Sequence, residues 1–176
     1  MGRATYELLT ANSVLPSVSL INKTMENYMP APVEGVCRFD ELNVFLEQRN
    51  LRKQVWIGED ATSLTGRIEY DSRTDTLIGF SSPLDPDTGF PIPYSFPATT
   101  FKDIIKALDN NHAAKYVNVL MARSTDKVKS PAFCLAVYGT DNSFSAEQVL
   151  QRWNFIKDEL AKRGIEMLAQ MVLGAT

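Results

Sequence analysis

The helix predicted over residues 146–163, with the apolar run that follows it, constrains the fold more than any other part of the sequence. Ser145 and Gln148 have the spacing of a capping box, and Gly164 is a typical residue just after a helix. The side chains predicted to form one buried stripe, with Lys157 as its only polar member, are Ala146, Val149, Leu150, Trp153, Ile156, Lys157 and Leu160. A helix of this length between two strands is typical of a right-handed crossover that joins parallel strands.

Two apolar segments can supply that parallel pair. Residues 165–173 (IEMLAQMVL) are mostly apolar, which is typical of a strand buried on both faces. Residues 54–60 (QVWIGED) form a short apolar strand that ends in two carboxylates. Two further strands, 116–122 and 131–138, are separated by a basic turn and are expected to pair antiparallel. These segments predict an α/β fold with a mixed sheet in the order β-β-β-α-β.

Residues 65–113 interrupt this order and are predicted to be an insertion. Two β-prone runs, 65–70 and 76–80, form a hairpin across a polar turn. Residues 81–97 contain five prolines and are expected to form an extended surface loop. A threonine at 99 or 100 then caps a short helix whose apolar face consists of Phe101, Ile104, Ile105 and Leu108.

The first 52 residues are predicted to be a helical N-terminal segment, which precedes a domain of residues 53–176. A first helix carries Val18, Ile21, Met25 and Tyr28 at helical spacing. A second helix is expected to be capped by Asp40 and to place Leu42, Phe45, Leu46 and Arg49 on one side.

Composition limits the classes of function. A net charge of −3 and a pI near 5.2 argue against a generic basic surface for nucleic acid. Cys37 and Cys134 are too far apart in sequence for a known metal or redox spacing. No secretory signal opens the chain, and no apolar run approaches the ~20 residues needed to span a bilayer. We therefore expect an intracellular protein without a membrane partner.

The candidate metal ligands are Glu59 and Asp60, because Mg²⁺ prefers oxygen ligands. Neighbouring residues of a strand point to opposite faces, so only one of the two can face a given site, and both can also be an ordinary solvated strand end. Arg123, Lys127 and Lys129 in the basic turn are candidates for contacts with backbone phosphates, or simply a charged turn. Both tryptophans, at positions 56 and 153, are expected in the core.

These features resemble the ribonuclease H-like catalytic domain of P-element-type, DDE-class transposases or a transposon-derived relative. The resemblance covers about residues 54–176. It rests on the segments Glu59-Asp60-Ala61-Thr62, Arg67-Ile68-Glu69-Tyr70-Asp71 with Leu77-Ile78-Gly79-Phe80, Val119-Leu120-Met121-Ala122 with Pro131-Ala132-Phe133-Cys134, and the helix that ends at Arg163-Gly164 with its following strand.

The resemblance implies that Asp60 is the first catalytic acid. The second acid of the family follows the strand equivalent to residues 165–173, at or just beyond Thr176, so the chain corresponds to the N-terminal half of the domain. The family uses two Mg²⁺ (or Mn²⁺) ions for phosphodiester displacement on DNA. We expect the isolated chain, which supplies one family carboxylate, to be inactive. A DNA partner, a nuclear location and homo-oligomers are further expectations.

Two other readings remain open from the sequence. The chain can be a domesticated, non-catalytic module that binds nucleic acid or protein. It can also be an unrelated α/β domain that binds a small molecule near residues 81–97. The sequence contains neither GxxxxGK[ST] nor GxGxxG, so no phosphate-binding loop supports this last reading.

Overall fold

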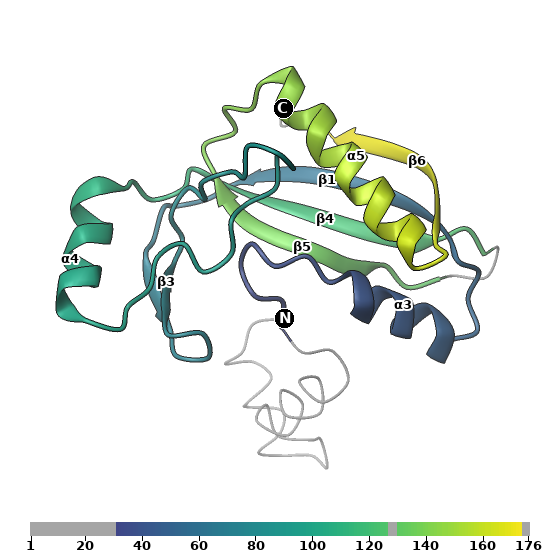
Figure 1. Ribbon diagram of the computed structural model, residues 1–176, viewed down its shortest axis with the longest axis horizontal. Coiled ribbons are helices and arrows are strands. Elements are labelled where there is room, and N and C mark those ends of the chain that lie inside the picture. Colours follow the sequence, from purple (N-terminus) through teal and green to yellow (C-terminus); the bar gives the residue numbers. More distant parts are fainter. Residues whose placement is uncertain (1–30, 127–129, 174–176) are drawn as a thin grey trace, which may run out of the picture. The chain divides into compact units, whose positions relative to one another are not determined.

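The computed structural model describes residues 31–126 and 130–173. All elements below belong to the unit of residues 32–176. The predicted helix around residues 18–28 lies outside the described residues. The described elements, labelled as in Figure 1, are α3 (Phe39–Gln48), β1 (Gln54–Ser63), β2 (Glu69–Asp71), β3 (Thr76–Ile78), α4 (Phe101–Asn110), β4 (Tyr116–Ser124), β5 (Phe133–Thr140), α5 (Ala146–Lys162) and β6 (Glu166–Leu173).

A four-stranded mixed sheet in the order β5-β4-β1-β6 organises the domain. Strands β5, β4 and β1 pair antiparallel, whereas β6 runs parallel to β1. Helix α5 makes the connection from β5 to β6 and crosses the sheet in Figure 1. The predicted α/β class and the pairing of the last strand with the strand that carries Asp60 are therefore confirmed.

Helices α3 and α5 share one hydrophobic core with the inward side chains of β1, β4 and β5. Trp153, Ile156 and Leu160 of α5 are buried as predicted, and the Ser145–Gln148 capping box is present. Two members of the predicted buried stripe are wrong, because Leu150 is 61% exposed and Lys157 is also exposed. The buried face is rotated toward position 152 instead. None of the helices in the described part of the chain is long and apolar enough to cross a bilayer.

Helix α3 lies within the segment 1–52 of the sequence-based division and contributes Phe39, Leu42, Phe45 and Leu46 to the core. Its N-cap is Arg38, which makes no side-chain cap, so the prediction that Asp40 caps this helix is wrong. Arg49 is exposed and lies over the ring of Phe45 rather than within the core, with its guanidinium carbon 4.2 Å from the ring centroid.

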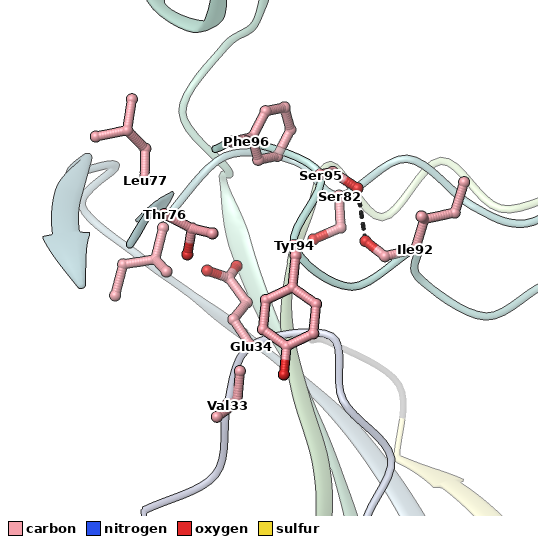
Figure 2. Close-up of a pocket in the computed structure, with 10 residues that line it drawn as sticks. Val33, Glu34, Thr76, Leu77, Ser82, Ile92, Tyr94, Ser95 and Phe96 are labelled. Atoms are coloured by element: carbon pink, nitrogen blue, oxygen red, sulfur yellow. Dashed lines mark hydrogen bonds between the residues drawn. The ribbon is translucent and has the colours of Figure 1, made fainter. Parts of the chain in front are cut away.

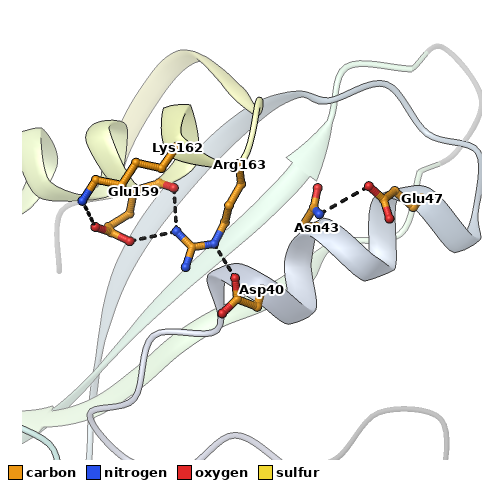
Figure 3. A network of polar contacts seen from close by, with 6 residues as sticks. All are labelled: Asp40, Asn43, Glu47, Glu159, Lys162 and Arg163. Atoms are coloured by element: carbon orange, nitrogen blue, oxygen red, sulfur yellow. Dashed lines mark hydrogen bonds and ion pairs between the residues drawn. The ribbon is translucent and has the colours of Figure 1, made fainter.

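Asp40 instead joins α3 to the end of α5 (Figure 3). The Arg163 Nε donates to Asp40 Oδ1 at 2.6 Å, and Arg163 Nη1 donates to Glu159 Oε2 at 2.8 Å. The hydrogen bond from Arg163 lowers the pKa of the Asp40 carboxyl below its usual range. Asp40 is highly exposed, so this pair orients two helix ends more than it stabilises the fold.

The insertion contains the predicted hairpin, formed by β2 and β3, and the predicted helix α4. Thr100 caps α4 through a capping box with Asp103. The expected apolar face of α4 is nevertheless mostly solvent-exposed: Phe101 is 78% exposed, and Ile105 and Leu108 are exposed as well.

The proline-rich loop of residues 81–97 contains no helix or strand, but it is not simply an extended surface loop. Phe90 is 4% exposed and packs against the rings of Tyr138 and Phe155. Gly89 and Pro91 are also buried. The loop therefore forms part of the wall of the core, because one aromatic side chain anchors it between the sheet and α5.

Candidate functional site

Strand β1 places its two adjacent carboxylates on opposite faces of the sheet. Val55, Ile57 and Glu59 point toward the core, and Glu59 is 4% exposed. Asp60 is exposed on the other face. The period of two along a strand requires this separation, so the two acids do not meet at one site.

Glu59 is held in a buried polar cluster with Arg152 of α5, Asn118 of β4 and Tyr138 of β5. The Arg152 Nη2 donates to Glu59 Oε1 at 2.8 Å, and Arg152 is 1% exposed. Asn118 Nδ2 lies 2.5 Å from the same oxygen and 2.6 Å from the Tyr138 hydroxyl. Burial raises the pKa of Tyr138 above its usual value, so this hydroxyl stays protonated at neutral pH.

Arg152 connects this cluster to the proline-rich loop. Its Nη1 donates to the Gly89 carbonyl at 3.4 Å, and its guanidinium carbon lies 4.5 Å from the centroid of the Phe144 ring. Burying two charges is costly unless they are paired, so removing one partner of the Glu59–Arg152 pair while the other stays buried would destabilise the core. We conclude that the charge of Glu59 is committed to a structural ion pair.

Asp60 has the geometry expected of a site residue at a sheet edge. It pairs with Val119 of β4 on one side and lies level with Leu173, the last residue of β6, on the other. Strand β1 itself continues past Asp60 to Ser63, so the prediction that this strand ends at its two carboxylates is wrong, and only β6 ends level with the exposed carboxylate. Within residues 31–126 and 130–173, however, no group of three or more His, Cys, Asp or Glu side chains is arranged to hold a metal ion. Asp60 by itself does not make a complete magnesium site.

Arg123 lies on the same face of the sheet as Asp60. It is exposed and pairs across strands with Trp56, four residues before Asp60 on β1. That separation corresponds to about 13 Å along the strand. Lys127 and Lys129, the other two predicted phosphate contacts, lie outside the described residues, so their roles stay predictions.

Sequence reasoning misplaced two residues of this region. The prediction that Trp56 lies in the core is wrong: its side chain is 49% exposed, while Trp153 is 3% exposed as predicted. The alternation of β1 was a usable signal, since burying Val55 and Ile57 forces Trp56 outward. Arg152 was missed because it is charged, although its spacing from Val149 and Ile156 places it on the buried stripe.

A half-buried carboxylate, Glu34, joins the start of the described chain to the insertion. Its Oε2 accepts the Gly79 N–H at 3.0 Å, and its Oε1 accepts the Gly139 N–H at 2.9 Å. It lines a cavity of about 20 Å³ beside Tyr94 and Ser82 (Figure 2), which is room for roughly one water molecule. A space of this size does not support a small-molecule site at this point of the loop.

Burial raises the pKa of Glu34 above its ordinary value of 4.5, and the two backbone N–H groups offset this only in part. A carboxyl whose pKa is higher in the folded chain than in the unfolded chain contributes to folding stability, and this contribution is fully present below the unfolded pKa. That stabilisation is lost as the pH rises through the folded pKa. We expect the melting temperature of the wild type, relative to Glu34→Gln, to fall as the pH rises above the ordinary glutamate pKa of 4.5. Thermal unfolding of both proteins at each pH measures this difference, because their other groups titrate alike. A constant difference would show that Glu34 does not change its proton affinity on folding.

The fold and site together define a mixed α/β domain whose central strand presents one exposed carboxylate beside the end of a parallel neighbour. No protein-family model matches the chain, and no curated protein matches it. Among solved structures, the chain is similar to the Drosophila P element transposase strand transfer complex, with 14% sequence identity and a TM-score of 0.49. The match covers 97% of this chain but 29% of that one, so the chain spans under a third of the length of the transposase.

Proposed function

We propose that this chain is part of a ribonuclease H-like domain of the transposase type, in which Asp60 is a ligand of a metal-dependent site for DNA phosphoryl transfer. The observation that carries the proposal is the position of Asp60 on β1 at the level of the last residue of β6. Ligands of α/β sheets bind outside the carboxyl ends of parallel strands, and Asp60 lies near these ends, three residues before Ser63, the last residue of β1. The sequence resemblance assigns the same residue.

Asp60 is preferred over Glu59 because the two carboxylates differ in availability. Glu59 is buried against Arg152, and a cation there would have to compete with the guanidinium at 2.8 Å. Asp60 is exposed and has no ion pair within the described residues. Since one carboxylate does not complete the coordination of Mg²⁺ or Mn²⁺, the remaining ligands would come from elsewhere in the polypeptide or from the nucleic acid.

The test compares metal binding by the 176-residue chain and three variants, with Mn²⁺ followed by electron paramagnetic resonance. We expect weak Mn²⁺ binding that Asp60→Asn abolishes and that the double variant Glu59→Gln with Arg152→Met, which removes both charges of the buried pair, does not. Asp109→Asn, which removes an exposed acid from α4, is the matched control and should bind Mn²⁺ like the wild type. Equal Mn²⁺ binding by wild type and Asp60→Asn would refute the assignment.

Activity is tested in the same proteins with a DNA substrate. We expect no cleavage or joining by the 176-residue chain with either metal. In a polypeptide that carries the other acids, Asp60→Asn should reduce activity by about 10- to 100-fold or more. Changes around a bound metal typically have an effect of this size. Cleavage by the 176-residue chain that Asp60→Asn leaves unchanged would contradict the proposal.

A non-catalytic module that binds nucleic acid is the second candidate. It is favoured by the lack of a metal-binding group in residues 31–126 and 130–173 and by the exposed Trp56–Arg123 pair. DNA binding that is insensitive both to Asp60→Asn and to metal removal, in a polypeptide without cleavage activity, would support this candidate over the first. Either function would be exercised on nuclear DNA.

A further inference from the structure

The outward face of the sheet carries an aromatic and a cationic side chain next to each other. Trp56 of β1 and Arg123 of β4 are direct cross-strand partners, and both side chains are exposed. Residues paired in this way have Cβ atoms about 4.5–5.5 Å apart. Leaving half of an indole in water is unfavourable, so this face is a candidate for contact with another molecule.

An open cavity, called the groove below, lies next to this pair. Gly58 follows Trp56 on the same face, and a Cβ added to Gly58 would meet nothing within 4 Å. Met121 pairs with Gly58, and both help to line an open cavity of about 470 Å³ together with Ala132. This volume lies within the range of about 300–1,000 Å³ that is typical of sites for small ligands.

Arg123 provides an uncommitted positive charge at the edge of the groove. No ion pair to it is present among the described residues, and the acid closest to it in the sequence already has a partner. Asp126, which also lines the groove, accepts the Arg52 backbone N–H at 2.7 Å and lies 3.3 Å from the Arg52 Nε. The groove therefore combines an apolar floor, an exposed indole and a guanidinium that is free to bind an anion.

We propose that this groove binds single-stranded nucleic acid, with a base stacked on Trp56 and a phosphate on Arg123. Base stacking on aromatic side chains combined with cationic contacts to the backbone is the general mode of single-strand binding. An apolar peptide would leave the guanidinium unpaired, whereas a nucleotide satisfies both groups. The proposal deepens the proposed function and rests on it for the choice of nucleic acid. A strand bound in the groove would continue along the same face toward Asp60, about 13 Å away.

The experiment is a titration of the 176-residue chain with a short oligothymidylate in EDTA, followed by tryptophan fluorescence. Trp153 is 3% exposed, so quenching reports on Trp56. We expect quenching by the single strand and weaker binding of a duplex of equal length. Trp56→Ala should weaken the affinity, measured by fluorescence anisotropy of a labelled oligonucleotide, about 5- to 150-fold. Trp56→Phe should retain part of it. Arg123→Ala should lower the salt slope by about one.

Arg67→Ala is the matched control for Arg123, since Arg67 is exposed on the insertion and pairs with Glu69 instead of lining the groove. It should leave the affinity and the salt slope unchanged. If Trp56→Ala and Arg123→Ala keep their circular dichroism spectra and bind the oligonucleotide like the wild type, the proposal is overturned. A second outcome would also overturn the proposal: the wild type does not bind the oligonucleotide but self-associates in sedimentation, and Trp56→Ala abolishes the self-association. The groove would then bind a second copy of the chain.

Omitting metal keeps this test separate from the test of Asp60. The contacts made by Trp56 and Arg123 do not include the metal, so oligonucleotide binding in EDTA should not depend on Mn²⁺. If Asp60 proves not to bind Mn²⁺ while Trp56→Ala still loses affinity for the single strand, the metal-dependent function fails and the groove assignment stands.

Discussion

Replacing Arg152 by Met is expected to lower the free energy of unfolding by about 3–5 kcal/mol, because it leaves the Glu59 carboxylate buried without its partner. Arg152 is 1% exposed and Glu59 is 4% exposed, so water cannot take over the lost contact without opening the core. The substitution also removes the hydrogen bond to the Gly89 carbonyl and the contact with Phe144. Denaturation by urea, followed by circular dichroism, measures the loss.

The double variant Glu59→Gln with Arg152→Met separates the charge effect from packing. Removing both charges of a buried pair is often neutral or stabilising, so the double variant should be more stable than Arg152→Met alone. Lys157→Met is the matched control on the same helix, because this side chain is exposed, and its effect should stay within about 0.5 kcal/mol. A double variant as unstable as Arg152→Met would show that shape, and not the unpaired carboxylate, accounts for the loss.

Gly89→Ala is expected to be the second most damaging substitution. Gly89 has a φ of +63°, a left-handed conformation that costs a residue with a Cβ about 1–2 kcal/mol. An added Cβ would also lie 2.3 Å from the Gln148 carbonyl oxygen, a backbone atom of α5 that cannot move without shifting the helix. Such overpacking typically costs a further ~1–3 kcal/mol. Urea denaturation, with tryptophan fluorescence as the signal, would measure the combined loss.

Gly164→Ala is the matched control for this prediction. Gly164 has a φ of +68°, close to that of Gly89, but a Cβ there would meet nothing within 4 Å. It should therefore show the conformational cost alone, and Gly89→Ala should exceed it by the cost of the clash. Equal losses in both variants would mean that the loop of residues 81–97 adapts freely and is not packed tightly against α5.

Local patterns in the sequence were sufficient to predict most of the secondary structure. The capping box at Ser145, the stop at Gly164 and the polar turn of the hairpin depend on neighbours within a few residues. The apolar composition of residues 165–173 correctly predicted a strand, but the prediction that it is buried on both faces is wrong, because Leu168 of the outermost strand β6 is 48% exposed. The parallel pairing of β6 with β1 agrees with the strand arrangement that the family resemblance implied, since the crossover by itself predicts a parallel neighbour but does not select which strand it is.

Long-range packing decided what the local patterns could not. Trp56 and Phe101 are exposed although both are large and apolar, and Arg152 is buried although it is charged. The burial of each side chain depends on what packs against it. Arg152 faces Glu59, whereas no described helix covers Trp56.

Backbone geometry and short-range periodicity were enough to predict where strands and helices form and that two adjacent carboxylates must point apart. Tertiary packing then selected Glu59 to face inward to Arg152 and Asp60 to face outward. Local pattern could not make this choice, because a strand has two faces with the same alternation. Packing of α5 on one face of the sheet determines which carboxylate is buried and which is available for function.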